Sequence, residues 1–114
     1  MDGDERDRGK LLIVDDEPDM LSLLERTLAP ETDWEIGTAQ SGEACLARLK
    51  EDAPDLILLD IRMPGMGGME VLERTRAMTQ PPTVIMMTAY GVIDLAVESI
   101  RKGAYDFITK PFDN

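Results

Sequence analysis

Three short runs of apolar residues stand out along this chain of 114 residues, and none of them alternates with polar residues. They cover residues 11–14, 56–59 and 84–87. Runs of this length are typical of strands buried on both faces, as in a parallel sheet between layers of helices. Residues 34–38 and 105–109 predict two weaker strands, so the pattern predicts five strands in all.

Between these strands, apolar residues recur at intervals of three or four, which predicts four helices, each with one apolar face. Pro18 suits the first turn of the first helix, Ser41 can cap the second, and Gly103 can end the fourth. The helices are expected over 18–28, after Ser41, over 68–78 and over 92–102. The residues that make up these patterns are, in chain order, Met20, Leu21, Leu24, Leu28, Ala44, Cys45, Leu46, Leu49, Met69, Leu72, Arg76, Ile93, Ala96, Val97 and Ile100, and the last four are expected to face inward.

Strand and helix therefore alternate, which predicts an α/β fold with right-handed crossovers. We expect a flavodoxin-like, doubly wound, five-stranded parallel sheet with strand order 2-1-3-4-5. Residues 1–9 are charged and polar and predict a flexible N-terminal tail, and residues 10–114 predict one domain. No helical pattern follows the fifth strand, so we expect the fifth helix to be missing and the domain to be truncated there.

Composition excludes several classes of function. The formal net charge of −11 argues against direct binding to nucleic acid, which requires clustered positive charge. No apolar run approaches the roughly 20 residues that span a membrane. A single cysteine rules out an internal disulfide and predicts a cytoplasmic location. The absence of histidine removes the usual hydrolase triads and most zinc sites.

Acidic, hydroxyl and ammonium groups follow the strands at their carboxyl ends. Asp15 and Asp16 follow the first strand, Asp60 the third, Thr88 the fourth and Lys110 the fifth. Ligands of open α/β sheets bind at this edge, where the strand order reverses. Clustered carboxylates repel each other, and Mg²⁺, which prefers hard oxygen ligands, relieves the repulsion. One carboxylate can then accept a phosphoryl group whose oxygens the hydroxyl and ammonium groups stabilise.

Taken singly, these residues have ordinary structural explanations. Asp15 and Asp16 can cap a helix, Asp60 can precede a turn, Thr88 can end a strand and Lys110 can be a solvated charge. All five at convergent strand ends of one chain favour a chemical site over five separate coincidences.

Four motifs in this order resemble the receiver domain of two-component response regulators. They read Ile-Val-Asp-Asp-Glu-Pro at 13–18, Leu-Asp-Ile-Arg-Met-Pro-Gly at 59–65, Met-Thr-Ala-Tyr-Gly at 87–91 and Lys-Pro-Phe at 110–112. The resemblance runs from about Lys10 to Phe112. The amino-acid sequence of residues 60–66 and 103–112 is closest to receivers of the nitrogen-regulatory type. Those receivers precede an ATPase module and a DNA-binding module in transcriptional activators.

The resemblance implies a role for each matching residue. Asp60 would be the phosphoacceptor, which receives its phosphoryl group from a partner sensor histidine kinase. Mg²⁺ would be bound by Asp16, by Asp15 directly or through water, by Asp60, and by the backbone carbonyl of Arg62. The protein would carry out self-catalysed phosphoryl transfer and slow autodephosphorylation, without turnover as an enzyme.

The resemblance also implies a switch. Thr88 would hydrogen-bond the phosphoryl group and move on activation, Lys110 would form an ion pair with it, and Phe107 would occupy the aromatic switch position. Ala89 would keep the pocket open, and the Lys110–Pro111 peptide bond would be cis. The surface formed by the helix over 92–102 and the strand over 105–109 would then change shape, and a homodimer through this surface is expected.

Three other functions fit these residues less well. A phosphatase that forms an aspartyl phosphate requires a second acid two residues after the nucleophile, where this chain has Arg62. A flavin or nucleotide binder requires a glycine-rich phosphate loop after the first strand, where this chain has Asp-Asp-Glu-Pro. A docking module without chemistry would not need Asp16, Asp60, Thr88 and Lys110 together.

Overall fold

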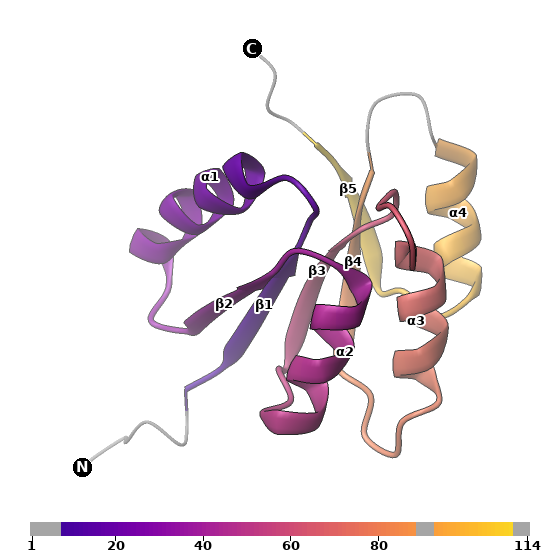
Figure 1. Ribbon diagram of the computed structural model, residues 1–114, viewed down its shortest axis with the longest axis horizontal. Coiled ribbons are helices and arrows are strands. Elements are labelled where there is room, and N and C mark those ends of the chain that lie inside the picture. The colour runs from indigo at the N-terminus through magenta and orange to yellow at the C-terminus, as the bar shows by residue number, and fades with distance from the viewer. Residues whose placement is uncertain (1–7, 89–92, 111–114) are drawn as a thin grey trace.

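The alternation of strand and helix is present in the computed structural model, which describes residues 8–88 and 93–110. Five strands form one parallel sheet in the order β2-β1-β3-β4-β5 (Figure 1). They are β1 (Lys10–Val14), β2 (Glu35–Ala39), β3 (Leu56–Asp60), β4 (Thr83–Thr88) and β5 (Asp106–Thr109). The predicted fold class and strand order are confirmed.

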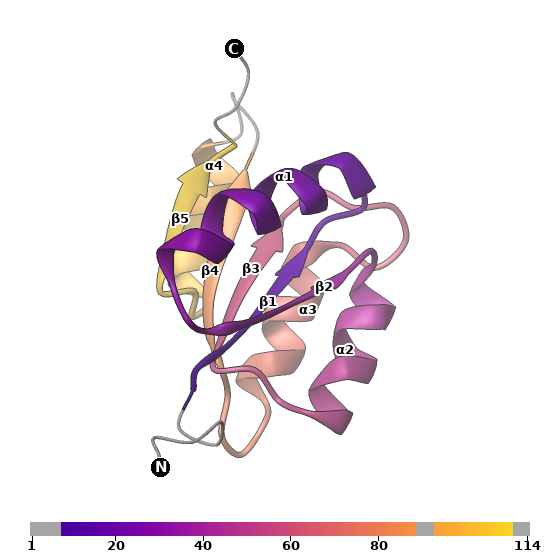
Figure 2. The ribbon, with the colours of Figure 1, turned by 90° about the vertical axis from the view of Figure 1, so that its left-hand side faces the viewer.

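Helices cover the two faces of the sheet unequally. The described residues contain α1 (Pro18–Leu28), the short 3-10 helix η2 (Ala29–Glu31), α2 (Gly42–Glu51), α3 (Gly68–Arg76) and α4 (Ile93–Arg101). Figures 1 and 2 show α1 on one face and α2, α3 and α4 on the other. A fifth helix is not found within the described ranges, as expected. None of the helices described is long and apolar enough to cross a membrane.

Both faces of the central strands are buried, which explains why their sequences do not alternate. In β1, Leu12 and Val14 pack into the cluster that includes α2 and α3, whereas Leu11 and Ile13 pack into the cluster that includes α1. All four side chains are at most 7% exposed. Burial of apolar side chains on two faces is the main stabilising contribution to such a sheet.

The three residues predicted to mark helix ends do so, although α3 ends two residues earlier than predicted, at Arg76. Pro18 is the first residue of α1, and the Ser41 hydroxyl accepts a hydrogen bond of 3.0 Å from Ala44 N. Gly103 follows α4 with a φ of 115°, a left-handed conformation that glycine adopts at low cost. These signals are local, so the sequence alone carries them.

The expected inward face of α4 was partly wrong. Ala96 is fully buried, but Val97 and Ile100 are 42% and 38% exposed. Ser99 is buried instead, because its hydroxyl donates to Ala96 O at 2.6 Å and needs no other partner. The side chain of Ile93 lies outside the described part.

Two smaller differences concern α3 and β2. In α3, Val71, Leu72 and Thr75 are buried, whereas Met69 is partly buried and Arg76, which was grouped with Met69 and Leu72 in the pattern, is exposed. The second strand lies one residue later than predicted and ends at the buried Ala39. At the start of the described chain, Arg8 Nε donates to Asp33 O, and Gly9 O accepts from Glu35 N.

Candidate functional site

The three predicted carboxylates meet at the carboxyl edge of the sheet. Asp15 directly follows β1, and Asp60 is the last residue of β3. These strands are parallel neighbours, with Val14 opposite Leu59, so their ends meet. One carboxylate oxygen from each of Asp15, Asp16 and Asp60 lies within 4.8 Å of the others. Asp15 and Asp60 are buried, whereas Asp16 is half-buried.

The carboxylate of Asp15 is held by the backbone around it. Its Oδ1 accepts a hydrogen bond of 3.0 Å from Glu17 N, and its own amide donates to Ala39 O at 3.1 Å. Its Oδ2 is buried and accepts no hydrogen bond among the residues described. The cation that lies next to this buried oxygen is the Lys110 ammonium group, with which it forms an ion pair.

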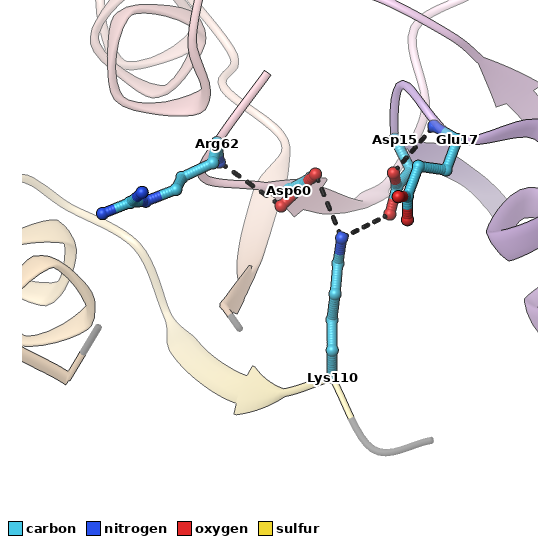
Figure 3. A network of polar contacts seen from close by, with 5 residues as sticks. All are labelled: Asp15, Glu17, Asp60, Arg62 and Lys110. Carbon is cyan, nitrogen blue, oxygen red and sulfur yellow. Dashed lines mark hydrogen bonds and ion pairs between the residues drawn. The ribbon is translucent and has the colours of Figure 1, made fainter. Parts of the chain in front are cut away.

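Lys110 supplies positive charge to two of the three carboxylates. Its Nζ lies 3.1 Å from Asp15 Oδ2 as an ion pair and 3.2 Å from Asp60 Oδ2 (Figure 3). Burial disfavours the charged ammonium, but Asp15 and Asp60 outweigh this effect and raise the pKa of Lys110 above its ordinary value. Lys110 therefore stays protonated at the centre of the site.

Asp60 lies where its negative charge is costly. Burial, followed by repulsion from Asp15, raises the pKa of Asp60 to about 6, although Lys110 and the Arg62 amide act in the opposite direction. The Arg62 amide donates to Asp60 Oδ1 at 3.3 Å. Figure 3 shows the Arg62 side chain directed away from the carboxylates. The nearby polar contact to Asp60 therefore comes from the Arg62 backbone.

The donor set fits a hard divalent cation. Three carboxylates face a single ammonium group, so the site carries excess negative charge. Its ligand atoms are all oxygens, which Mg²⁺ prefers to nitrogen or sulfur. Asp15 and Asp60 are already paired with Lys110, so such an ion would share these carboxylates with the ammonium group. Ligation by the Arg62 carbonyl stays a prediction.

The two predicted switch residues occupy different surroundings. Thr88, the last residue of β4, is fully buried, and its carbonyl accepts from Lys110 N at 2.8 Å. Phe107 is half-buried and packs against the larger core cluster. Ala89, expected to keep the pocket open, and Pro111, expected to follow a cis peptide bond, lie outside the described residues.

Two features of the site were missed in the sequence. Ala39 at the end of β2 anchors Asp15, because its carbonyl accepts a hydrogen bond from the Asp15 amide. Gly68 lies against the acceptor strand so closely that an added Cβ would be 2.2 Å from Asp60 O. The pair Gly67-Gly68 after the third strand was the available signal, since glycine often marks close approach of two backbones.

Comparison with known protein families identifies the family to which this fold belongs. The family model of the response regulator receiver domain matches residues 11–114. The chain belongs to this family. Its receiver fold is also found in solved structures: over 90% of this chain it matches 87% of the receiver domain of NtrX from Brucella abortus, with 38% identity and a TM-score of 0.83.

The curated relatives of this receiver include regulators of the nitrogen-regulatory type, as its sequence motifs indicated. The receiver is 40% identical to the DNA-binding transcriptional regulator NtrC of Salmonella typhimurium over 93% of its length and 39% identical to the regulatory protein AtoC of Escherichia coli over 91%. It spans 22% of the length of each of these relatives. It is also 39% identical to the sporulation initiation phosphotransferase F of Bacillus subtilis, over 91% of this chain and 83% of that protein.

Proposed function

We propose that this receiver accepts a phosphoryl group on Asp60 from a phosphohistidine of a partner sensor histidine kinase. The observation that carries the proposal is the contact of Lys110 with both Asp15 and Asp60 beside Asp16. These 114 residues contain no histidine, so the proposed phosphohistidine donor lies outside them. We take residues 10–114 as the receiver domain and residues 1–9 as its tail.

In the transfer, an oxygen of Asp60 forms a bond to phosphorus while the bond from phosphorus to the donor imidazole nitrogen breaks. The imidazole keeps the electron pair of that bond and takes up a proton from solvent. Asp60 acts as its carboxylate, and Lys110 offers an ammonium group to the phosphoryl oxygens. Mg²⁺, when held by Asp15, Asp16, Asp60 and the Arg62 carbonyl, supplies positive charge for those oxygens.

Two features of the residue at position 62 favour a phosphoacceptor over a phosphatase that turns over its substrate. The residue two positions after Asp60 is Arg62, which can donate no proton as a carboxylic acid would. Its side chain is directed away from Asp60 (Figure 3). The phosphorylated state would therefore persist long enough to signal, with only slow autodephosphorylation.

The proposal is tested by intact mass after incubation with acetyl phosphate, with and without Mg²⁺. We expect a Mg²⁺-dependent gain of about 80 Da, one phosphoryl group, that is absent in Asp60→Asn. Asp33→Asn, which changes an exposed carboxylate far along the chain, is the matched control and should label as the wild type does. Full labelling of Asp60→Asn would overturn the acceptor assignment.

We further propose that phosphorylation draws Thr88 toward the phosphoryl group and lets Phe107 repack, which changes the surface of α4 and β5. Exposed apolar side chains are already present there, among them Val97, Ile100 and Ile108. A homodimer would form through this surface and would regulate an output module that controls transcription. The protein would act in the cytoplasm. The receiver itself would not contact nucleic acid, because its net charge is −11.

Sedimentation of the phosphorylated protein tests the switch and the dimer together. Phosphorylated wild type should sediment as a dimer, whereas Thr88→Ala, labelled to the same extent, should stay monomeric. Equal association of the two proteins would show that Thr88 does not couple the site to this surface.

A further inference from the structure

The loop between β3 and α3, residues 61–67, holds the backbone next to the acceptor. Its two ends are joined, because Gly68 N donates to Ile61 O at 2.9 Å. Gly68 also lies against the acceptor backbone, where an added Cβ would be 2.8 Å from Ile61 Cα. Any displacement of this short loop therefore reaches the backbone of Asp60 and Arg62.

The other side of this loop lies against α2, a helix that carries none of the predicted site residues. Gly42, the first residue of α2, is buried, and a Cβ there would be 2.9 Å from Met66 O and 3.0 Å from Met66 Cβ. It would also be 2.9 Å from Val71 Cγ2, on α3. The two distances of 2.9 Å are shorter than real Cβ contacts, and a backbone oxygen such as Met66 O cannot rotate away as a long side chain can.

The reason for glycine at this position is space. Among the described residues, positive φ angles occur at Gly65 and Gly103, so Gly42 has an ordinary backbone conformation. Another residue type could adopt that conformation, but its Cβ would displace the loop. The absence of a side chain at Gly42 is what lets Met66 lie against α2.

The start of α2 is itself held firmly. The Ser41 hydroxyl accepts from Ala44 N, and Cys45 N donates to Ser41 O, each at 3.0 Å. Cys45 is fully buried in the core cluster beneath this turn. A side chain added at residue 42 would therefore move the loop more readily than the helix.

From these contacts we propose that Gly42 is a positioning residue for the acceptor site. It lets the loop of residues 61–67 lie against α2, and this fixes the Arg62 amide beside Asp60 Oδ1 and the backbone at Arg62 beside the carboxylates. The inference rests on the proposed function, because it concerns the same site. Positioning groups outside the ligand shell typically change metal affinity by about 10- to 100-fold.

The test is Mg²⁺ binding to the Gly42→Ala protein, measured by calorimetry on the full chain, alongside the rate of labelling by acetyl phosphate at saturating Mg²⁺. We expect about tenfold weaker Mg²⁺ binding and slower labelling, with the helical circular dichroism signal retained. The matched control is Gly67→Ala in the same loop, where a Cβ would be an ordinary 3.6 Å from Ile61 O. The control should bind Mg²⁺ within about twofold of the wild type, in contrast to the tenfold loss.

A double variant separates loop displacement from repacking of the core. Gly42→Ala with Val71→Ala removes the contact to Val71 and keeps the contact to Met66. We expect it to bind Mg²⁺ about tenfold more weakly than Val71→Ala alone, and this comparison also serves if Gly42→Ala alone does not fold. Equal affinity of these two proteins, or wild-type affinity of Gly42→Ala, would overturn the inference. A wild type that neither binds Mg²⁺ nor gains mass would instead overturn the proposed function, and this inference with it.

Discussion

Ion pairs of almost equal length occur in two different environments of this receiver. At the carboxyl edge of the sheet, Lys110 Nζ lies 3.1 Å from Asp15 Oδ2 and 3.2 Å from Asp60 Oδ2. On the outer surface of α3, an Arg74 guanidinium nitrogen lies 3.0 Å from Glu70 Oε2. The side chains of the first group are 17% exposed or less, whereas those of Arg74 and Glu70 are 55% and 49% exposed.

The comparison shows that distance alone does not determine how much an ion pair stabilises the folded protein. Water screens the pair on α3, and ordering two long side chains offsets much of its attraction. At the sheet edge, desolvation is costly, and two buried carboxylates share one ammonium group. The buried group therefore opposes folding in part, and its excess negative charge is what a cation can bind.

Removal of the central ammonium should have the largest effect. We expect Lys110→Met to lower the free energy of unfolding of the metal-free protein by about 3–5 kcal/mol at neutral pH, because two buried carboxylates lose their counter-charge. The measurement is urea denaturation in the presence of a chelator. Adding Asp60→Asn to this variant should restore most of the loss, and a double variant as unstable as Lys110→Met would contradict this explanation.

The pH dependence of stability should be the next largest effect. The pKa of Asp60 is raised from 3.8 to about 6, so the folded state binds the proton more tightly than the unfolded state does. The contribution of Asp60 should therefore destabilise the metal-free protein by about 3 kcal/mol above about pH 6, and this should be relieved as the pH falls toward about 4.

Asp60→Asn is the variant that isolates this contribution. It should be more stable than the wild type at pH 7 without metal, and its stability should lack the part of the pH dependence that comes from Asp60. The measurement is thermal unfolding in the presence of a chelator, from about pH 4 to about pH 8. Parallel curves for the two proteins would mean that the Asp60 carboxylate is not destabilised by burial.

The exposed pair should give the smallest effect. Arg74→Ala removes its contact with Glu70 one turn away on α3, and we expect a loss of about 0.3–0.5 kcal/mol in urea denaturation at low salt. The loss should shrink further in about 1 M salt, where charges on the surface are screened within about 3 Å. A loss as large as that of Lys110→Met would remove the distinction between the two environments.

Part of the site could be predicted from the sequence, because the order of motifs along the chain marks the ends of strands. Asp15 and Asp60 follow uninterrupted apolar runs, and parallel neighbours bring such positions together. The inward face of α4 could not be predicted from apolar spacing alone. Ser99 is buried and Val97 exposed, because a serine that bonds its own helix backbone can replace an apolar residue in the core.

The sequence by itself determined the five strands, their order through the receiver motifs, and the types of group at the carboxyl edge. Local signals in the sequence also marked helix ends, such as the Ser41 cap and the left-handed Gly103. Only the tertiary structure decided that Lys110 lies between Asp15 and Asp60, that Asp15 Oδ2 is buried, and that α2 lies against the loop after Asp60. These properties depend on distances between segments far apart in the chain, and distance and burial set the energy of a charge in a protein.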